Sequence, residues 1–202
     1  MKHSVLLSGT ADPSRRPAIV ALLLLALVAC DGDERDRAPQ SASTPAAAAS
    51  PEAPRPQELE HAARAVIAFL QGDPPSNRFR LADNVTLYLA PEGGGARAAV
   101  TRESLANRAN WKVASHRQGT EYSFVPPGGL TKLTTRVGRH LNCLDYPLSS
   151  RFEQLALLPH VGTKLEPESA SSCLQSWNLT LVFDPELRPL TIVAAVYDQW
   201  EW

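Results

Sequence analysis

A regular spacing of apolar residues predicts the first helix of the chain. Between Glu58 and Gln71, apolar side chains recur every three or four positions, which places them on one face of an α-helix. Glu58 suits the positive end of the helix dipole, and Gly72 supplies a stop signal. The apolar face consists of Leu59, Ala62, Ala63, Val66, Ile67 and Leu70. The pattern therefore predicts an amphipathic helix over residues 58–71.

Alternation of apolar and polar residues predicts β-strands after this helix. Residues 85–90 alternate, and we expect residues 96–100 to return beside them after the glycine-rich turn at 91–95. Thr101 is a favourable N-cap for a short helix over residues 102–110. The same signals predict strands at 111–125 and 130–137 and a short helix at 150–158.

The strongest strand signals come near the end of the sequence. Residues 177–183 alternate, a proline-containing turn follows at 184–189, and residues 190–202 resume the alternation. Both faces of this last segment carry apolar side chains, such as Ile192 on one and Val193 on the other. We therefore expect it to be a central strand that is covered on both sides.

These elements together predict an α+β fold for one globular domain, residues 57–202. All thirteen aromatic residues lie at or beyond Phe69, so the apolar core belongs to this region. We expect an N-terminal helix packed on a curved, mainly antiparallel sheet. That arrangement is similar in pattern to the cystatin and NTF2-like folds.

A segment of low complexity precedes this domain. Sixteen of the nineteen residues from 38 to 56 are Ala, Pro, Ser or Thr, and residues 31–56 contain no aromatic residue, Val, Ile, Leu or Met. Such a composition cannot bury a core. Residues 30–56 are therefore predicted to be a disordered tether that begins at Cys30.

The first thirty residues carry the features of an export signal. Lys2, Arg15 and Arg16 precede an uninterrupted apolar run over residues 18–29, and Cys30 follows it. The end of this run, Leu27-Val28-Ala29-Cys30, resembles the lipobox of bacterial lipoprotein precursors. The resemblance covers residues 1–30 and implies cleavage before Cys30 and lipidation of its sulfur. An ordinary secretory signal or a retained anchor remains the alternative, and the true start codon can lie after Met1.

The lipoprotein resemblance implies a location on the periplasmic side of the bacterial envelope, with the membrane as a partner through the lipid. Asp31 follows the cysteine, as in lipoproteins that enteric bacteria retain in the inner membrane, so it favours that membrane over the outer one. The chain has 20 basic and 21 acidic residues, and this balance excludes the basic excess of a nucleic-acid binder. No nucleic-acid partner is therefore expected.

Two cysteines remain in the predicted domain once Cys30 is assigned to the lipid. Cys143 and Cys173 allow a single intramolecular pairing, and an oxidising compartment favours a disulfide. The bridge would close a loop of about thirty residues and stabilise the fold by about 3–4 kcal/mol. The segment between the cysteines is rich in Pro and Ser, and we expect residues 144–172 to be irregular apart from the short helix.

Candidate chemistry is sparse. The sequence contains no nucleophile elbow, phosphate loop, dinucleotide fingerprint or metal-binding motif, so we assign no catalytic residue, cofactor or metal. The densest polar group contains Arg139, His140 and Asp145, in which His140 can act as a base oriented by Asp145. A solvent-facing loop pinned by the disulfide is the favoured alternative. Trp200 and Trp202 are either core residues or part of a partner-binding surface.

The sequence thus favours a membrane-anchored periplasmic lipoprotein that acts as a non-enzymatic binding, inhibitory or envelope-associated module, with a possible protein partner. The alternative is a periplasmic enzyme or small-ligand binder that uses a pocket in the α+β domain. Such a pocket would be lined by His116, His140, Glu121 or Asp198.

Overall fold

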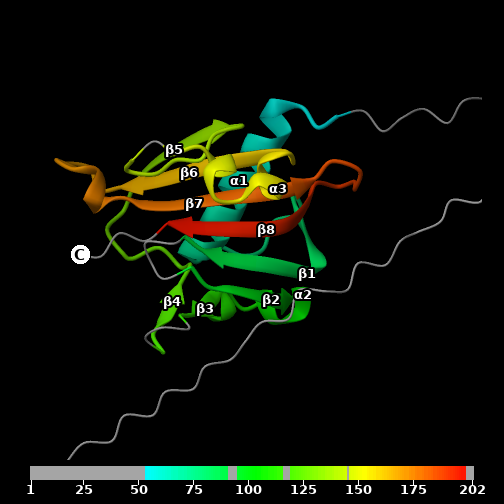
Figure 1. Cartoon of the computed structure of the whole chain (residues 1–202), viewed down its shortest axis with the longest axis horizontal. Helices are drawn as coiled ribbons and strands as arrows, with labels where there is room; N and C mark the ends of the chain where they lie inside the picture. The colour runs from blue at the N-terminus through cyan, green and yellow to red at the C-terminus, as the bar shows by residue number, and fades with distance from the viewer. Residues whose placement is uncertain (1–52, 91–94, 116–118, 145, 199–202) are drawn as a thin grey trace, which may run out of the picture. The chain divides into compact units, whose positions relative to one another are not determined.

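One six-stranded sheet organises the folded part of the chain (Figure 1). The structure, a computed structural model, describes residues 53–90, 95–115, 119–144 and 146–198. The strands lie in the order β2-β1-β8-β7-β6-β5, and every neighbouring pair is antiparallel except β1 and β8. Their bounds are β1 Arg80–Leu89, β2 Arg97–Thr101, β5 Lys132–Val137, β6 His160–Glu166, β7 Trp177–Asp184 and β8 Thr191–Asp198. The predicted α+β class is confirmed.

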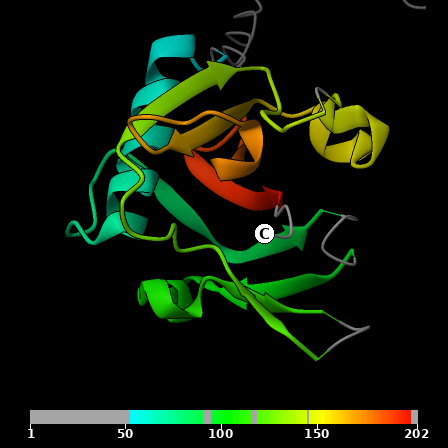
Figure 2. The ribbon, with the colours of Figure 1, turned by 90° about the vertical axis from the view of Figure 1, so that its left-hand side faces the viewer.

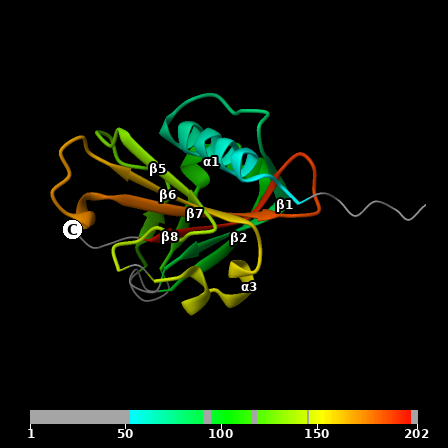
Figure 3. The ribbon, with the colours of Figure 1, turned by 90° about the horizontal axis from the view of Figure 1, so that it is seen from above.

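Helix α1, Pro56–Gln71, covers one face of this sheet (Figure 3). It begins at Pro56, a position where proline is tolerated because its missing N–H would have no partner within the helix. It ends at Gly72, whose φ of 125° is accessible to glycine and strained for other residues. Its buried residues are Leu59, Ala62, Ala63, Val66, Ile67, Phe69 and Leu70. The predicted helix is thus confirmed, with its start at Pro56 instead of Glu58.

A polar contact fixes α1 over the edge strand β5. Glu60 Oε1 accepts hydrogen bonds from Thr135 Oγ1 at 2.6 Å and from Arg64 Nη2 at 2.9 Å. The hydrogen bond from Thr135, followed by that from Arg64, holds the pKa of the Glu60 carboxyl below its usual value. Apolar packing places the helix on the sheet, and this contact adds a directional link to β5.

The opposite face of the sheet carries a smaller apolar cluster. It is covered by two short helices, η3 (Leu148–Ser150) and α3 (Glu153–Ala156), which lie across the sheet from α1 in Figure 3. Leu148 packs there with Val182, Ala194 and Val196. The ring of Phe152 meets Tyr88 of β1 edge-on, with ring centroids 5.2 Å apart. The helix predicted over residues 150–158 is therefore two short turns.

Strand β8 is central and buried on both faces, as its sequence predicts. It pairs with β7 on one side and with β1 on the other. Ile192 belongs to the α1 core, and Ala194 belongs to the cluster beneath α3. The parallel pairing of β8 with β1 joins segments more than a hundred residues apart, and the sequence pattern did not predict it.

The segment between β2 and β5 differs from the prediction. The helix expected over residues 102–110 is divided into α2, Arg102–Leu105, and η2, Arg108–Asn110. The division arises because the Asn107 side chain accepts a hydrogen bond from the backbone N–H of Ala109 and so starts a new turn. The predicted N-cap is confirmed, since Thr101 Oγ1 accepts from the Ser104 N–H at 3.3 Å.

The strand expected over residues 111–125 is a hairpin of two short strands, β3 (Lys112–Ala114) and β4 (Glu121–Ser123). Figure 2 shows this hairpin beside β2, at the bottom of the view. Gly119 has a φ of 64°, and the Ser115 N–H donates to the Thr120 carbonyl oxygen at 2.8 Å. These turn features reverse the chain where the sequence analysis expected one continuous strand.

The expectation of an irregular segment over residues 144–172 is wrong, because β6 lies within it. Val161, Thr163 and Leu165 alternate toward the α1 core, and all three are almost fully buried. Gly162 and the prolines that flank this segment weaken its strand signal in the sequence. The strand forms because it is paired on both sides, with β5 and with β7.

The predicted cysteine pair is present in the structure. Cys143 and Cys173 form a disulfide with a Cα–Cα distance of 5.4 Å. Cys173 begins the short helix η4, Cys173–Gln175, which leads into β7. The bridge therefore ties the loop that follows β5 to the start of a strand near the middle of the sheet.

Replacing Cys143 and Cys173 together with Ser is expected to lower the melting temperature by about 6–16 °C. The bridge closes a thirty-residue separation, so its loss should remove about 3–4 kcal/mol, at about 2–4 °C per kcal/mol for a domain of this size. Scanning calorimetry of the oxidised protein measures the shift. Reductant should produce a similar shift in the wild type and none in the double variant. Two titratable thiols in the exported protein would contradict the bridge.

Candidate functional site

His140, a candidate from the sequence, lies buried between two side chains of the sheet. Its Nε2 is 2.7 Å from Asp198 Oδ2, and its Nδ1 is 2.7 Å from Thr180 Oγ1. The side chains of His140 and Asp198 are 7% and 8% exposed. Thr180 belongs to β7 and Asp198 ends β8, so the His140 side chain links these two neighbouring central strands.

A glycine allows the loop after β5 to lie this close to the sheet. Gly162 of β6 is paired with Arg136 on one side and with Thr180 on the other. A Cβ at Gly162 would collide with the carbonyl oxygen of Arg139 and lie 2.8 Å from the backbone nitrogen of Leu141. The absence of that Cβ lets the backbone on both sides of His140 pack directly onto β6.

The imidazole of His140 has one favourable neutral arrangement. A proton on Nε2 faces the Asp198 carboxylate, and the Thr180 hydroxyl then donates to Nδ1. When the ring is cationic, Nδ1–H donates to the Thr180 oxygen instead. Among the described residues, Asp198 Oδ2 accepts no well-aligned hydrogen bond, so its close contact with His140 Nε2 is its principal compensation.

Hydroxyl, imidazole and carboxylate in this order are also the groups of a hydrolase triad, but the arrangement here lacks access. Thr180 is 1% exposed and lies within the central strand β7, where a substrate cannot reach its oxygen. The three residues therefore form a buried polar cluster that positions the loop. The carboxylate that contacts His140 is Asp198, whereas Asp145, which the sequence analysis proposed as its orienter, lies outside the described residues.

A large cleft opens beside this cluster, between the end of β5 and the two short helices. Its volume is about 1010 Å³. Four basic side chains and one acidic side chain line it: Arg136, Arg139, His140, His160 and Glu153. The aliphatic residues of the lining are Leu141, Leu148, Ala156 and Leu157, and Gly138, Tyr146, Pro147 and Ser149 complete it. The cleft thus combines basic and apolar side chains.

The two arginines of the cleft are available to a ligand. Arg136 donates from Nη1 to the Thr135 carbonyl oxygen at 3.1 Å, and both side chains are largely exposed. Within the described part of the chain, neither guanidinium forms an ion pair with a carboxylate. By contrast, Lys164 on neighbouring β6 is paired with Glu166 at 2.9 Å. The positive charge in the cleft is therefore not neutralised by described acidic residues.

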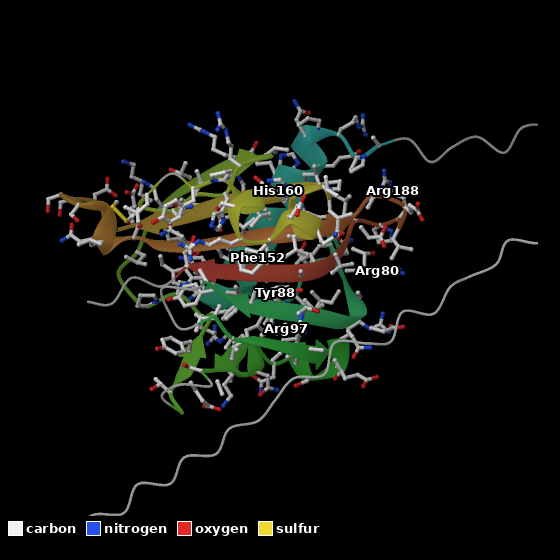
Figure 4. All side chains as sticks on the ribbon, viewed as in Figure 1. Arg80, Tyr88, Arg97, Phe152, His160 and Arg188 are labelled. Atoms are coloured by element: carbon white, nitrogen blue, oxygen red, sulfur yellow. A yellow bond between two sulfur atoms is a disulfide. The ribbon has the colours of Figure 1, made fainter. Side chains whose placement is uncertain are left out.

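His160 contributes a fourth polar group to the same cleft. Its Nδ1 lies 2.9 Å from the Leu158 carbonyl oxygen, which can only accept, so Nδ1 carries the proton. Its Nε2 is then left to contact a ligand. Figure 4 shows His160 on the same side of the sheet as Phe152 and Tyr88, the side that α3 covers.

A much smaller cavity lies under the cleft, where His140 and Asp198 meet Tyr146 and Arg151. Its volume of about 10 Å³ is at the lower limit for one water molecule. The Arg151 guanidinium stacks over the Tyr146 ring at 4.9 Å from its centroid. The buried cluster thus forms part of the cleft floor and encloses no room for a substrate of its own.

Tyr197, next to Asp198, is a core residue. Its ring packs against Phe124 and Trp177, with centroid distances of 5.2 and 5.9 Å. Burial, with a further contribution from the Asp198 charge, raises the pKa of Tyr197 to about 12. This phenol therefore stays protonated at neutral pH and does not act as a general base.

Among the described residues, one further sequence candidate, Glu121, does not line this cleft. Glu121 lies on β4, where it pairs with Lys112 at 2.7 Å. Cys30, His116, Trp200 and Trp202 lie outside the described residues. In the ranges that the structure describes, no group of three or more His, Cys, Asp or Glu residues could hold a metal ion. No protein-family model, curated protein or solved structure matches this chain.

Replacing His140 with Leu is expected to lower the free energy of unfolding by about 3–5 kcal/mol, because the Asp198 carboxylate is left buried without its partner. Adding Asp198→Leu should recover most of that loss, since an apolar pair can replace a buried polar pair at little cost. Urea denaturation of both single variants and the double variant measures the coupling. His61→Leu, at an exposed position of α1, is the control and should change stability by less than about 0.5 kcal/mol. Additive effects would show that the two residues do not interact.

Proposed function

We propose that this chain is an exported, lipid-anchored protein whose domain binds a small molecule in the cleft without transforming it. The observation that carries the proposal is the cleft of about 1010 Å³ in which four basic side chains converge. Its volume is at the upper end of the range for small-molecule sites, and few polar groups on an apolar lining are typical of such sites. The proposal thus takes the ligand-binding alternative from the sequence and retains the predicted lipoprotein anchor.

Binding is favoured over catalysis because the described residues of the cleft supply no accessible nucleophile beside a base. His140, the best candidate for a base, has both ring nitrogens within 2.7 Å of other side chains. The hydroxyl that it contacts is sealed in β7. A ligand in the cleft therefore meets guanidinium and imidazole groups that can hold it, but no activated attacking group.

The sequence supports the location. The export signal ends in Leu27-Val28-Ala29-Cys30, and a lipoprotein of this kind is held by more than one acyl chain. Among the described helices, none is long and apolar enough to cross a membrane. A flexible segment of the length of residues 31–56 would reach roughly 25–30 Å. The proposed arrangement is a binding domain held close to, but not against, the membrane surface.

A protein-binding role is the second candidate, and one observation favours it. Leu144 and Leu174 are 51% and 48% exposed, and each follows a cysteine of the disulfide. Each leucine exposes apolar surface beside the crosslink, and burying that surface against a partner protein would be favourable. This surface and the cleft involve different residues, so variants can separate the two roles.

The anchor is tested by replacing Cys30 with Ser. Because acyl chains buried in the bilayer would hold the protein there, the variant is expected to appear in the soluble periplasmic fraction or to remain as an unprocessed precursor. Fractionation of cells and the mass of the mature protein distinguish these results from the wild type. Normal cleavage with unchanged membrane association would contradict lipidation of Cys30.

Ligand binding in the cleft is tested by mass spectrometry of small molecules extracted from the protein purified from the envelope. Ser149→Trp places a large side chain at the cleft wall and should remove most of any bound ligand. Ser169→Trp, at an exposed serine that does not line the cleft, is the matched control and should retain it. Equal recovery from both variants would place the ligand elsewhere, and no recovery from the wild type would oppose a ligand-binding role.

A further inference from the structure

We infer that the ligand of the cleft is an amphipathic acid, in which a phosphate or carboxylate group is joined to a short apolar chain or ring. This inference rests on the proposed function, because it names the chemical class of the molecule that the cleft binds. It is carried by the two kinds of side chain that line the cleft: the arginines come from β5 and the loop after it, whereas most of the apolar residues come from the η3–α3 segment.

The basic side of the cleft selects the acidic group. Arg136 is the second-last residue of β5, on the face that α3 covers, and Arg139 follows in the adjoining loop. A guanidinium presents parallel N–H donors that match the oxygens of a carboxylate or phosphate. His160 Nε2 adds a third contact and donates when the ring is protonated. Glu153 is the one acidic side chain among the described residues of the cleft, so the site favours an anion over a cation.

The apolar side selects the rest of the ligand. Leu157 is 78% exposed, the largest exposure of any bulky apolar side chain in the described ranges. It follows α3 directly and lines the cleft together with Ala156. Contact with an alkyl chain or ring would remove this side chain from water, which favours an amphipathic ligand over a purely polar one.

The size of the cleft supports the same class. An inorganic anion would fill a small part of about 1010 Å³ and leave the apolar side in contact with water. An acid joined to an alkyl chain or ring would also remove apolar lining from water. The floor of the cleft is held in place, because Gly162 and the His140 cluster keep the loop that carries Arg139 against the sheet.

The test is calorimetric titration of the full chain carrying Cys30→Ser, which avoids detergent, with four probes: octyl phosphate, octyl glucoside, octylamine and inorganic phosphate. Octyl phosphate is expected to bind most tightly. Replacing Arg136 and Arg139 together with Gln should weaken the binding of octyl phosphate about tenfold to a hundredfold, as expected for the loss of charge-assisted hydrogen bonds. Arg97→Gln, on β2 at the other edge of the sheet, is the matched control and should leave binding unchanged (Figure 4).

A second pair of variants tests the apolar side. Leu157→Ser should weaken octyl phosphate about threefold to tenfold and leave any binding of inorganic phosphate unchanged. Leu187→Ser, at a similarly apolar exposed position in the turn before β8, is the control and should have no effect. Inorganic phosphate binding as tightly as octyl phosphate would overturn the requirement for an apolar part.

The outcomes also separate this inference from the proposed function. If octyl glucoside or octylamine binds as well as octyl phosphate and Ser149→Trp blocks it, the cleft binds ligands but the acidic class is wrong. If none of the probes binds and the envelope protein yields no extracted ligand, both proposals fail. If octyl phosphate binds, sedimentation with vesicles of phosphatidylglycerol identifies the source of the ligand. Binding to the vesicles that depends on the arginines indicates a bilayer lipid, and absence of such binding indicates a free amphiphile. The ligand is an amphipathic acid in either case.

Discussion

Burial of β8 on both faces is the constraint on which the rest of the domain depends. Helix α1 covers one side of this strand, and the η3–α3 segment covers the other, so its side chains build two apolar clusters at once. The strand ends at Asp198, which leaves the apolar interior and meets His140. A buried carboxylate needs a partner with opposite charge or donors, and the loop after β5 supplies one. The packing of the sheet thus determines where that loop has to lie.

Three independent restraints act on the loop after β5. Gly162 permits close approach to β6, His140 reaches Thr180 and Asp198, and the bridge from Cys143 fixes the far end. A loop held in this way keeps its arginines at constant positions relative to the η3–α3 wall. Preorganised charged groups bind with less loss of side-chain freedom than mobile ones. The loop on one side of the cleft is therefore preorganised by these three restraints.

The sequence predicts those elements whose buried residues repeat with a regular period. It does not predict elements whose formation depends on pairing with distant strands. The α1 stripe and the alternation in β7 have a regular period, whereas a register shift in β8 places Ile192 and Ala194 on opposite faces. The richness in Pro and Ser around β6 predicts an irregular segment, and Gly162 adds no strand signal, although the same glycine admits the His140 loop. Alternation also carries no information about pairing, so neither the β1–β8 contact nor the meeting of His140 with Asp198 could be derived. The disulfide could be predicted because only two cysteines remain in the domain once Cys30 is assigned to the lipid.

The parallel pairing of β1 with β8 has a consequence for the order in which the domain forms. Register partners such as Arg80 and Thr191 are separated by most of the domain, and closing such a long segment is a slow step in folding. Until β8 is present, β1 and β7 have no common neighbour and the sheet has no centre. A chain that emerges gradually from a ribosome or a translocation channel thus remains without its core until its last strand arrives. For a protein proposed to cross a membrane, that delay keeps the chain unfolded while it passes through the channel.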